Sequence, residues 1–144
     1  MKYYELTQLY EKLFSTSKRL LKTKYLSDFF ATLKPEDLDL LLNLIRGKIF
    51  SDSEEEKLGI SAKLILKAIV SSTGMTLREV EQEWRKKGDL GLVAESLISK
   101  KKQVTLFSQD LEVEKVYSNL RKLPTIEGEK SVDKKCGLIS ELLT

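Results

Sequence analysis

Apolar residues recur at every third or fourth position through almost the whole chain, and this spacing constrains the fold more than any other feature of the sequence. One face of an α-helix has this period, whereas a half-buried strand alternates at every second residue. Only seven Gly and two Pro interrupt the 144 residues, which leaves room for long helices. The sequence therefore predicts an all-α protein, an irregular bundle of about seven or eight helices.

Capping residues predict where several of these helices begin. Pro35 suits the first turn of a helix, and Ser61 and Ser131 can each cap one. Thr76 and Glu79 have the spacing of a capping box, in which each side chain accepts a bond from the backbone N–H of the other residue. These positions divide the chain into helices of ordinary length.

The apolar pattern also predicts which residues share a buried face. One stripe runs from Leu6 to Leu21 and a second from Leu26 to Leu33, and in a later helix Leu77 is expected to face the core. The segment 103–109 is predicted to be an exposed connection. An apolar pattern is still running at Thr144 and no helix stop signal follows, so we expect the sequence to be a fragment of a longer protein.

Composition excludes several kinds of site. The chain has no His, which removes the commonest general base and metal ligand, and it has neither of the Gly-rich phosphate motifs. The single Cys136 excludes an internal disulfide and a zinc site, and it fits a reducing compartment. No stretch approaches the roughly 18 apolar residues of a membrane span. We therefore expect no catalytic centre, no metal, no cofactor and no membrane partner for this chain.

Basic residues gather beside three predicted helix starts, together with small or flexible residues that let the backbone approach a ligand. Backbone N–H groups at a helix start attract phosphate, and Lys and Arg neutralise its charge. The net charge is only +3, so this uneven distribution, rather than the total charge, indicates a polyanionic partner. The residues predicted to contact phosphate are Ser17, Lys18, Arg19, Lys22, Lys87, Gly88, Gly91, Lys130, Ser131, Lys134 and Lys135.

A short segment after three consecutive lysines has the pattern of a peptide that docks on a sliding clamp. Gln103 is followed at the third and fourth positions by Leu106 and Phe107. The Gln would enter a small polar pocket, and the two apolar side chains would fill an apolar groove. The pattern is short and common, so apolar residues of an ordinary loop remain the alternative.

Taken together, these residues resemble the N-terminal DNA-binding domain of ATP-dependent DNA ligases of the archaeal and eukaryotic replicative type. The resemblance implies that residues 1–144 are a DNA-binding domain at the N-terminal end of a longer ligase. It depends most on the block Gly88-Asp89-Leu90-Gly91-Leu92-Val93-Ala94-Glu95. The other segments that carry it are Ser17–Leu20, Leu58–Ile60, Leu64–Ile69, Val116–Tyr117, Gly128, Ser131, Lys134, Lys135 and Leu138.

The resemblance implies a function as well as a fold. Such a domain holds nicked duplex DNA by the minor groove and the phosphate backbone, without sequence preference, during replication, repair and recombination. Its partners are the nicked duplex, a sliding clamp of the PCNA type and the catalytic domains of the same protein, which use ATP and Mg²⁺. The K-x-D-G motif of the adenylated lysine is absent, because Lys87-Gly88-Asp89 is followed by Leu90. The resemblance places the protein in the cytoplasm at the nucleoid in an archaeon, or in the nucleus in a eukaryote.

Two positions depart from the family pattern, and two other functions stay open. Leu106 stands where archaeal relatives often have an aromatic residue, and Lys130 stands where a glycine or small residue is more usual. One alternative is an interaction scaffold that acts mainly by docking Gln103–Phe107 on a sliding clamp. The other is a small helical enzyme, which the missing His residues, metal ligands and phosphate loops disfavour.

Overall fold

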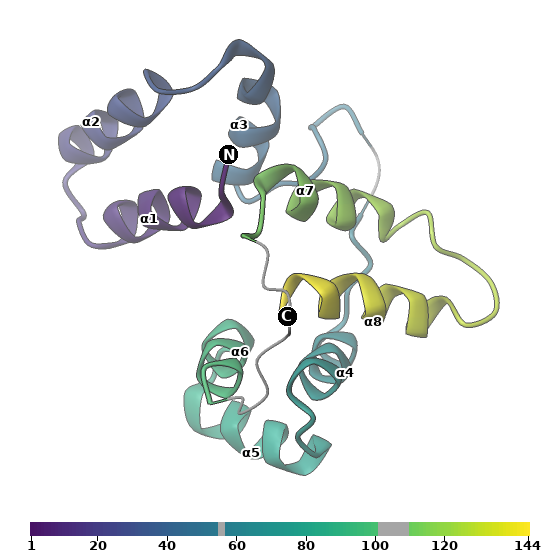
Figure 1. Cartoon of the computed structure of the whole chain (residues 1–144). Coiled ribbons are helices and arrows are strands. Elements are labelled where there is room, and N and C mark those ends of the chain that lie inside the picture. Colours follow the sequence, from purple (N-terminus) through teal and green to yellow (C-terminus); the bar gives the residue numbers. More distant parts are fainter. Residues whose placement is uncertain (55–56, 101–109) are drawn as a thin grey trace. The chain divides into compact units, whose positions relative to one another are not determined.

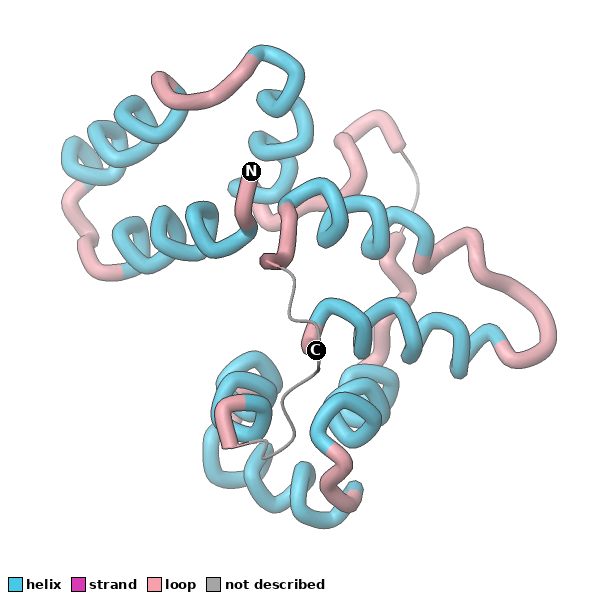
Figure 2. Tube along the Cα trace, viewed as in Figure 1, coloured by secondary structure: helices cyan, strands magenta, loops and turns pink. Residues whose placement is uncertain are grey.

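The computed structural model describes residues 1–54, 57–100 and 110–144 (Figure 1). These residues form eight α-helices and one short 3₁₀ helix joined by loops, and Figure 2 contains no strand among them. The all-α prediction is confirmed. The chain divides into two compact units, Met1–Glu56 with Asp110–Ser118, and Lys57–Gln109 with Asn119–Thr144. Among the described residues, no helix is long and apolar enough to cross a membrane.

Most helices of the first unit bury apolar residues. Its elements are α1 (Tyr3–Phe14), α2 (Arg19–Phe30), η1 (Pro35–Asp37), α3 (Leu38–Ile45) and the beginning of α7 (Val113–Lys122). Pro35 begins η1, as predicted. The Tyr10 hydroxyl donates to the Leu44 carbonyl at 3.0 Å and joins α1 to α3. The buried apolar residues of this unit are Leu6, Leu9, Leu41, Leu44, Ile49, Val113 and Val116.

The predicted stripe from Leu6 to Leu21 is wrong. Helix α1 ends at Phe14 and α2 begins only at Arg19, so the residues on either side of this link do not share one helical face. Phe14 is 94% exposed and Leu20 is 86% exposed. Helix α2 contains most of the residues of the predicted second stripe, and no residue of α2 is buried.

The second unit is built around α4 (Ala62–Thr73), which packs against α5 (Leu77–Lys87), α6 (Leu90–Ile98) and α8 (Ser131–Leu142). Helices α4, α5 and α6 share one core cluster, formed by Leu66, Ile69, Val80, Val93, Ala94 and Leu97. A second cluster joins α4 to α8 and to the residue that follows α7, and consists of Leu64, Ala68, Leu123 and Ile139. One side of α4 therefore anchors α5 and α6, and another anchors α8.

Most of the predicted helix starts in this unit are confirmed by their hydrogen bonds. The Ser61 hydroxyl accepts from the Leu64 N–H at 3.2 Å. Both halves of the capping box are present, because the Thr76 N–H donates to Glu79 at 2.8 Å and the Glu79 N–H donates to the Thr76 hydroxyl at 3.4 Å. Two expectations are wrong. Leu77 is 48% exposed, because it is the first residue of α5 and precedes the turn that faces the core.

The second error concerns the start of α8. Ser131 does not cap this helix but is its first residue, and Lys130 occupies the cap position without a side-chain hydrogen bond. The Ser131 N–H donates to the Gly128 carbonyl at 3.2 Å, so the chain turns one residue earlier than predicted. Lys130 has φ +60°, and it is the one non-glycine residue of the described chain with a positive φ.

Candidate nucleic-acid interface

Helices α4 and α8 pack against each other. Near their C-terminal ends, the hydroxyls of Ser72 and Ser140 are 2.8 Å apart. Near their N-terminal ends, residues of both helices line one pocket. The peptide dipoles of a helix sum to a positive N-terminal end, and here residues from two such ends line the same pocket.

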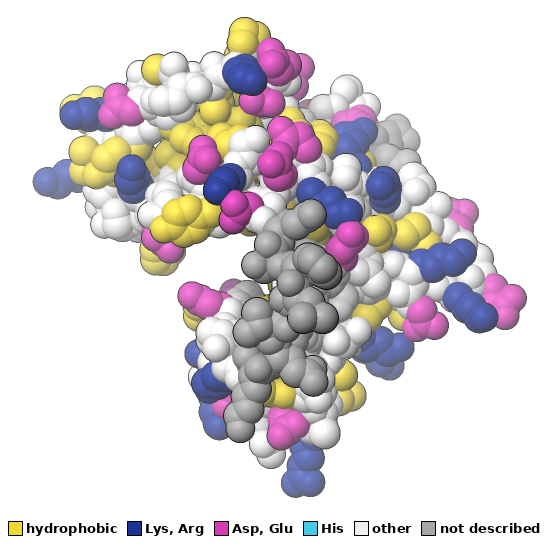
Figure 3. All heavy atoms as spheres, in the orientation of Figure 1, with side chains coloured by type: hydrophobic (Ala, Val, Ile, Leu, Met, Phe, Trp, Pro, Cys, Tyr) yellow, Lys and Arg dark blue, Asp and Glu magenta, His cyan; other side chains and the backbone are white. Residues whose placement is uncertain are grey.

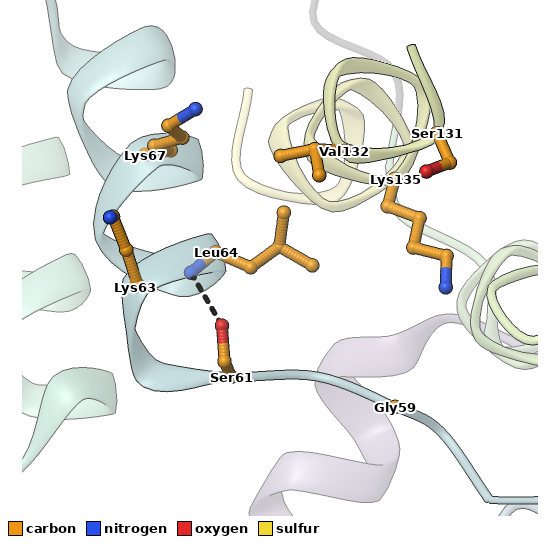
Figure 4. Close-up of a pocket in the computed structure, with 8 residues that line it drawn as sticks. All are labelled: Gly59, Ser61, Lys63, Leu64, Lys67, Ser131, Val132 and Lys135. Carbon is orange, nitrogen blue, oxygen red and sulfur yellow. Dashed lines mark hydrogen bonds between the residues drawn. The ribbon is translucent and has the colours of Figure 1, made fainter. Parts of the chain in front are cut away.

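The pocket between these two helix starts has a volume of about 340 Å³ (Figure 4). Lys63 and Lys67 extend from α4, and Ser131 and Lys135 lie on α8 across from them. Apolar side chains separate the two groups. The eight residues that line the pocket are Gly59, Ser61, Lys63, Leu64, Lys67, Ser131, Val132 and Lys135.

The charged side chains that line the pocket are all lysines. No acidic side chain is among its lining residues, and none of its three lysines makes an ion pair within the described residues. The start of α8 has no side-chain cap, although its first N–H, that of Ser131, donates to the Gly128 carbonyl, whereas Ser61 caps α4. Cations and helix starts are the groups that attract phosphate and other anions in proteins.

The structure brings together part of one predicted cluster with residues that the sequence interpretation missed. Ser131 and Lys135 line the pocket, while Lys130 and Lys134 lie beside it at the start of α8. The missed residues are Gly59, Ser61, Lys63 and Lys67. A glycine, a capping serine and a lysine also stand together in this segment, so the signal that identified the other three helix starts is present here as well.

The predicted cluster between α5 and α6 offers a cation but few free backbone donors. The Gly88 N–H donates to the Trp84 carbonyl at 2.8 Å, and the Asp89 carboxylate accepts from the Leu92 N–H at 2.9 Å. This carboxylate caps α6 and lies where a phosphate would otherwise bind. A side chain at Gly91 would place its Cβ 3.1 Å from the same carboxylate. The contribution of Lys87, Gly88 and Gly91 to a phosphate site stays a prediction.

The predicted cluster in the first unit lies at the start of α2. Lys18 is the N-cap residue of α2 and makes no side-chain cap, and the first turn of the helix has no acidic residue. The Lys18 N–H donates to the Thr16 hydroxyl at 3.2 Å, which fixes the link before the helix. Ser17, Lys18 and Arg19 are exposed, and Lys22 is half-buried. The start of α2 thus has neither a side-chain cap nor an acidic residue, whereas the first turn of α8 contains Asp133.

The described residues contain no group of three or more His, Cys, Asp or Glu that could hold a metal ion. Burial raises the pKa of the Cys136 thiol, which disfavours the nucleophilic thiolate. The segment predicted to dock on a clamp, with Gln103, Leu106 and Phe107, lies outside the described residues.

Comparison with known proteins decides the family. A family model described as the DNA ligase N terminus matches residues 2–144. The chain belongs to the DNA ligase N-terminal family. It is 41% identical over 142 residues to a DNA ligase of Methanothermobacter thermautotrophicus, covering 99% of this chain and 26% of the relative. It is 39% identical to a DNA ligase of Thermococcus onnurineus and 38% identical to one of Nitrosopumilus maritimus, in each case over 99% of this chain and about a quarter of the ligase.

The chain thus spans about a quarter of the length of the ligases that it matches. It corresponds to the N-terminal segment of a DNA ligase and not to the catalytic part of one. Within this family segment, basic residues line the pocket between α4 and α8 and surround the start of α2.

Proposed function

We propose that this chain binds duplex DNA without sequence preference, as the N-terminal module of an ATP-dependent DNA ligase that acts at nicks. The observation that carries the proposal is the pocket at the starts of α4 and α8, which holds three unpaired lysines and no acidic lining residue. Membership in the DNA ligase N-terminal family supports the proposal, because a ligase acts on DNA, whose backbone carries phosphate.

Backbone phosphate is the part of DNA that the pocket fits. Lysine is a flexible point charge, and backbone N–H groups at a helix start point along the helix axis, so neither group reads the pattern of base edges. Lys63, Lys67 and Lys135 would neutralise one stretch of phosphates, and the uncapped start of α8 would donate to an oxygen of that stretch. The start of α2, with Ser17, Lys18, Arg19 and Lys22, would hold phosphates in the first unit.

A salt titration tests the proposal. The chain is titrated into a short labelled duplex with a central nick between about 50 and 200 mM salt, because each phosphate neutralised adds about 0.9 to the steepness of log K against log[salt]. We expect the triple substitution Lys63→Gln, Lys67→Gln and Lys135→Gln to weaken binding and to make this slope shallower by about one to two. Duplexes of unrelated sequence should give the same result.

A matched control uses three lysines that already have carboxylate partners. Lys2 pairs with Asp110, Lys48 with Asp52 and Lys86 with Glu83. Each triple substitution removes three positive charges from a net charge of +3, so the two variants carry the same formal charge. If the slope of log K against log[salt] becomes as shallow in the control variant as in the pocket variant, the net charge of the chain and not the pocket governs binding. The assignment of the site is then wrong. If the unmodified chain fails to bind at low salt, the proposed DNA-binding function is wrong.

The longer protein extends the proposal beyond this chain. We infer that it is an ATP-dependent ligase that works in replication, repair and recombination, in an archaeal cytoplasm at the nucleoid or in a eukaryotic nucleus. ATP and Mg²⁺ would be bound outside residues 1–144, because the K-x-D-G sequence is missing here. This chain would raise the local concentration of the catalytic domains at a nick.

Docking on a sliding clamp of the PCNA type is a separate proposal. It depends only on the sequence of Gln103, Leu106 and Phe107. The substitution Phe107→Ala should abolish clamp binding and leave DNA binding unchanged, because the DNA contacts proposed above lie elsewhere. Equal loss of both activities would contradict this division.

A further inference from the structure

Asn119, in α7, is a buried amide with an incomplete set of hydrogen bonds. Its side chain is 1% exposed. The amide nitrogen donates to the Leu138 carbonyl at 3.2 Å and to the Glu141 carboxylate at 2.9 Å, so both of its N–H groups are used. The amide oxygen is buried and has no hydrogen-bond partner among the described residues. A buried acceptor without a partner costs free energy, so stability alone does not explain an asparagine here.

An apolar residue of similar shape would cost the fold little. The Leu138 carbonyl lies inside α8, where the backbone N–H four residues later is its regular partner. Glu141 is exposed, so water can solvate its carboxylate without the amide. The surroundings already suit an apolar side chain, because Leu120 and Leu138 pack against an apolar core cluster. Asn119 should therefore contribute something other than stability.

The two bonds of the amide fix the register of α8, that is, its position along its own axis relative to its neighbours. Leu138 and Glu141 are three residues apart and lie on one face of the helix. A shift of α8 by one turn, about 5.4 Å, would break both bonds. Apolar contacts have no such direction and would re-form with other partners. Buried polar contacts are one means by which packed helices select a single register.

The basic pocket depends on this register. Lys135 lies three residues before Leu138 on α8, and Lys63 and Lys67 extend from α4 (Figure 4). Among the described residues, Ser140 makes every hydrogen bond between α4 and α8, so no polar contact to α4 holds the start of α8 directly. A shift of α8 would therefore move the basic side chains around its start, at the right of Figure 3, away from the lysines of α4.

We propose that Asn119 is a positioning residue for phosphate binding: it fixes the register of α8, and α8 then places Lys135 across the pocket from Lys63 and Lys67. This inference rests on the proposed DNA-binding function and adds to it a residue that does not touch DNA. Loss of the amide should lower the affinity for DNA without a matching loss of stability. Because the loss falls on phosphate contacts, it should also change the salt dependence of binding.

The first test replaces the amide with its apolar shape analogue, Asn119→Leu. The variant should melt close to the temperature of the unmodified chain. Loss of one phosphate contact should make the slope of log K against log[salt] shallower by about one, and lower the affinity for a nicked duplex about eightfold at roughly 100 mM salt. Asn43→Leu is the matched control, because this half-buried amide donates to the Tyr117 hydroxyl at 3.5 Å in the first unit. If the bulk of leucine lowers the melting temperature, the smaller Asn119→Val is measured in the same way.

A reversible link between α4 and α8 separates register from every other effect of the substitution. Ser72→Cys with Ser140→Cys, in a chain that also carries Cys136→Ser, places two thiols where hydroxyls lie 2.8 Å apart. Their disulfide should form more slowly when Asn119→Leu is added, which measures the register without DNA. Once formed, the disulfide should restore the affinity and the slope that Asn119→Leu removes. Addition of a reductant should abolish this rescue in the same sample.

The outcomes separate this inference from the proposed function. If the unmodified chain binds DNA and Asn119→Leu changes neither affinity nor slope, the inference is wrong and the proposed function stands. If both Asn119 variants lose stability and affinity together and the disulfide restores no binding, Asn119 only stabilises the fold, and the inference is again wrong. If the unmodified chain does not bind at low salt, the proposed function is wrong, while slower disulfide formation would still show that Asn119 sets the register of α8.

Discussion

Replacement of Lys130 by glycine should stabilise the protein, although it removes a side chain. Lys130 has φ +60° and ψ 19°, in the left-handed region. This conformation costs a residue with a Cβ about 1–2 kcal/mol, because the Cβ approaches the following carbonyl. Glycine avoids that cost but loses about 0.5–1 kcal/mol through the greater freedom of the unfolded chain. The net gain is about 0.5–1 kcal/mol, which should raise the melting temperature by roughly 3 °C.

Thermal unfolding followed by circular dichroism measures this effect. Lys134 and Lys135 follow Lys130 closely, so relief of charge repulsion could also stabilise the variant. Lys130→Ala separates the two causes, since it removes the charge and keeps the Cβ. We expect Lys130→Ala to melt at or below the temperature of the unmodified protein. Equal stabilisation by alanine and glycine would refute the argument from backbone conformation.

Two further predictions concern the two units separately. In the second unit, Ile69 is fully buried where α4 meets α5 and α6, so Ile69→Ala should cost about 2–5 kcal/mol in urea unfolding, and a loss below 1 kcal/mol would contradict this core assignment. In the first unit, hydrogen bonds from Lys48 and Arg46 lower the pKa of Asp52 from 3.8 to about 2. Since the folded value lies below the unfolded one, the pair stabilises the native state above about pH 4 and loses this effect as the pH falls toward 2. Carboxyl NMR titration of Asp52 checks the direction, and Lys48→Gln should move the pKa back up.

Local signals predicted the helices of the second unit well. Ser61, Thr76 and Glu79 act through bonds to backbone groups within three residues, so their effect can be read without knowledge of the rest of the fold. A helix start was predicted at Ser17, Lys18 and Arg19, and α2 begins there, but the apolar stripe was wrongly extended across the link that precedes it. Residues 15–18 contain neither Gly nor Pro, and apolar residues on both sides keep an approximate helical period.

The candidate site could be predicted only in part. The start of α8 was found from Ser131, Lys134 and Lys135, which are close together in the sequence. Lys63 and Lys67 line one pocket with Lys135 only because α4 and α8 pack together, and the bond between Ser72 and Ser140 that accompanies this packing has no local sequence pattern. The apolar pair Phe14 and Leu20 was assigned to the core, since periodicity identifies an apolar face but not what covers it.

One NMR measurement tests most directly the claim that these helix starts hold DNA. The backbone amides of the ¹⁵N-labelled chain are followed while a short nicked duplex is added at low salt. We expect the largest shifts at residues 59–67 and 130–135 in the second unit and at residues 17–22 in the first. The account would be contradicted if the starts of α2, α4 and α8 showed no change and large shifts were confined to other surfaces, such as the acidic segment 110–114.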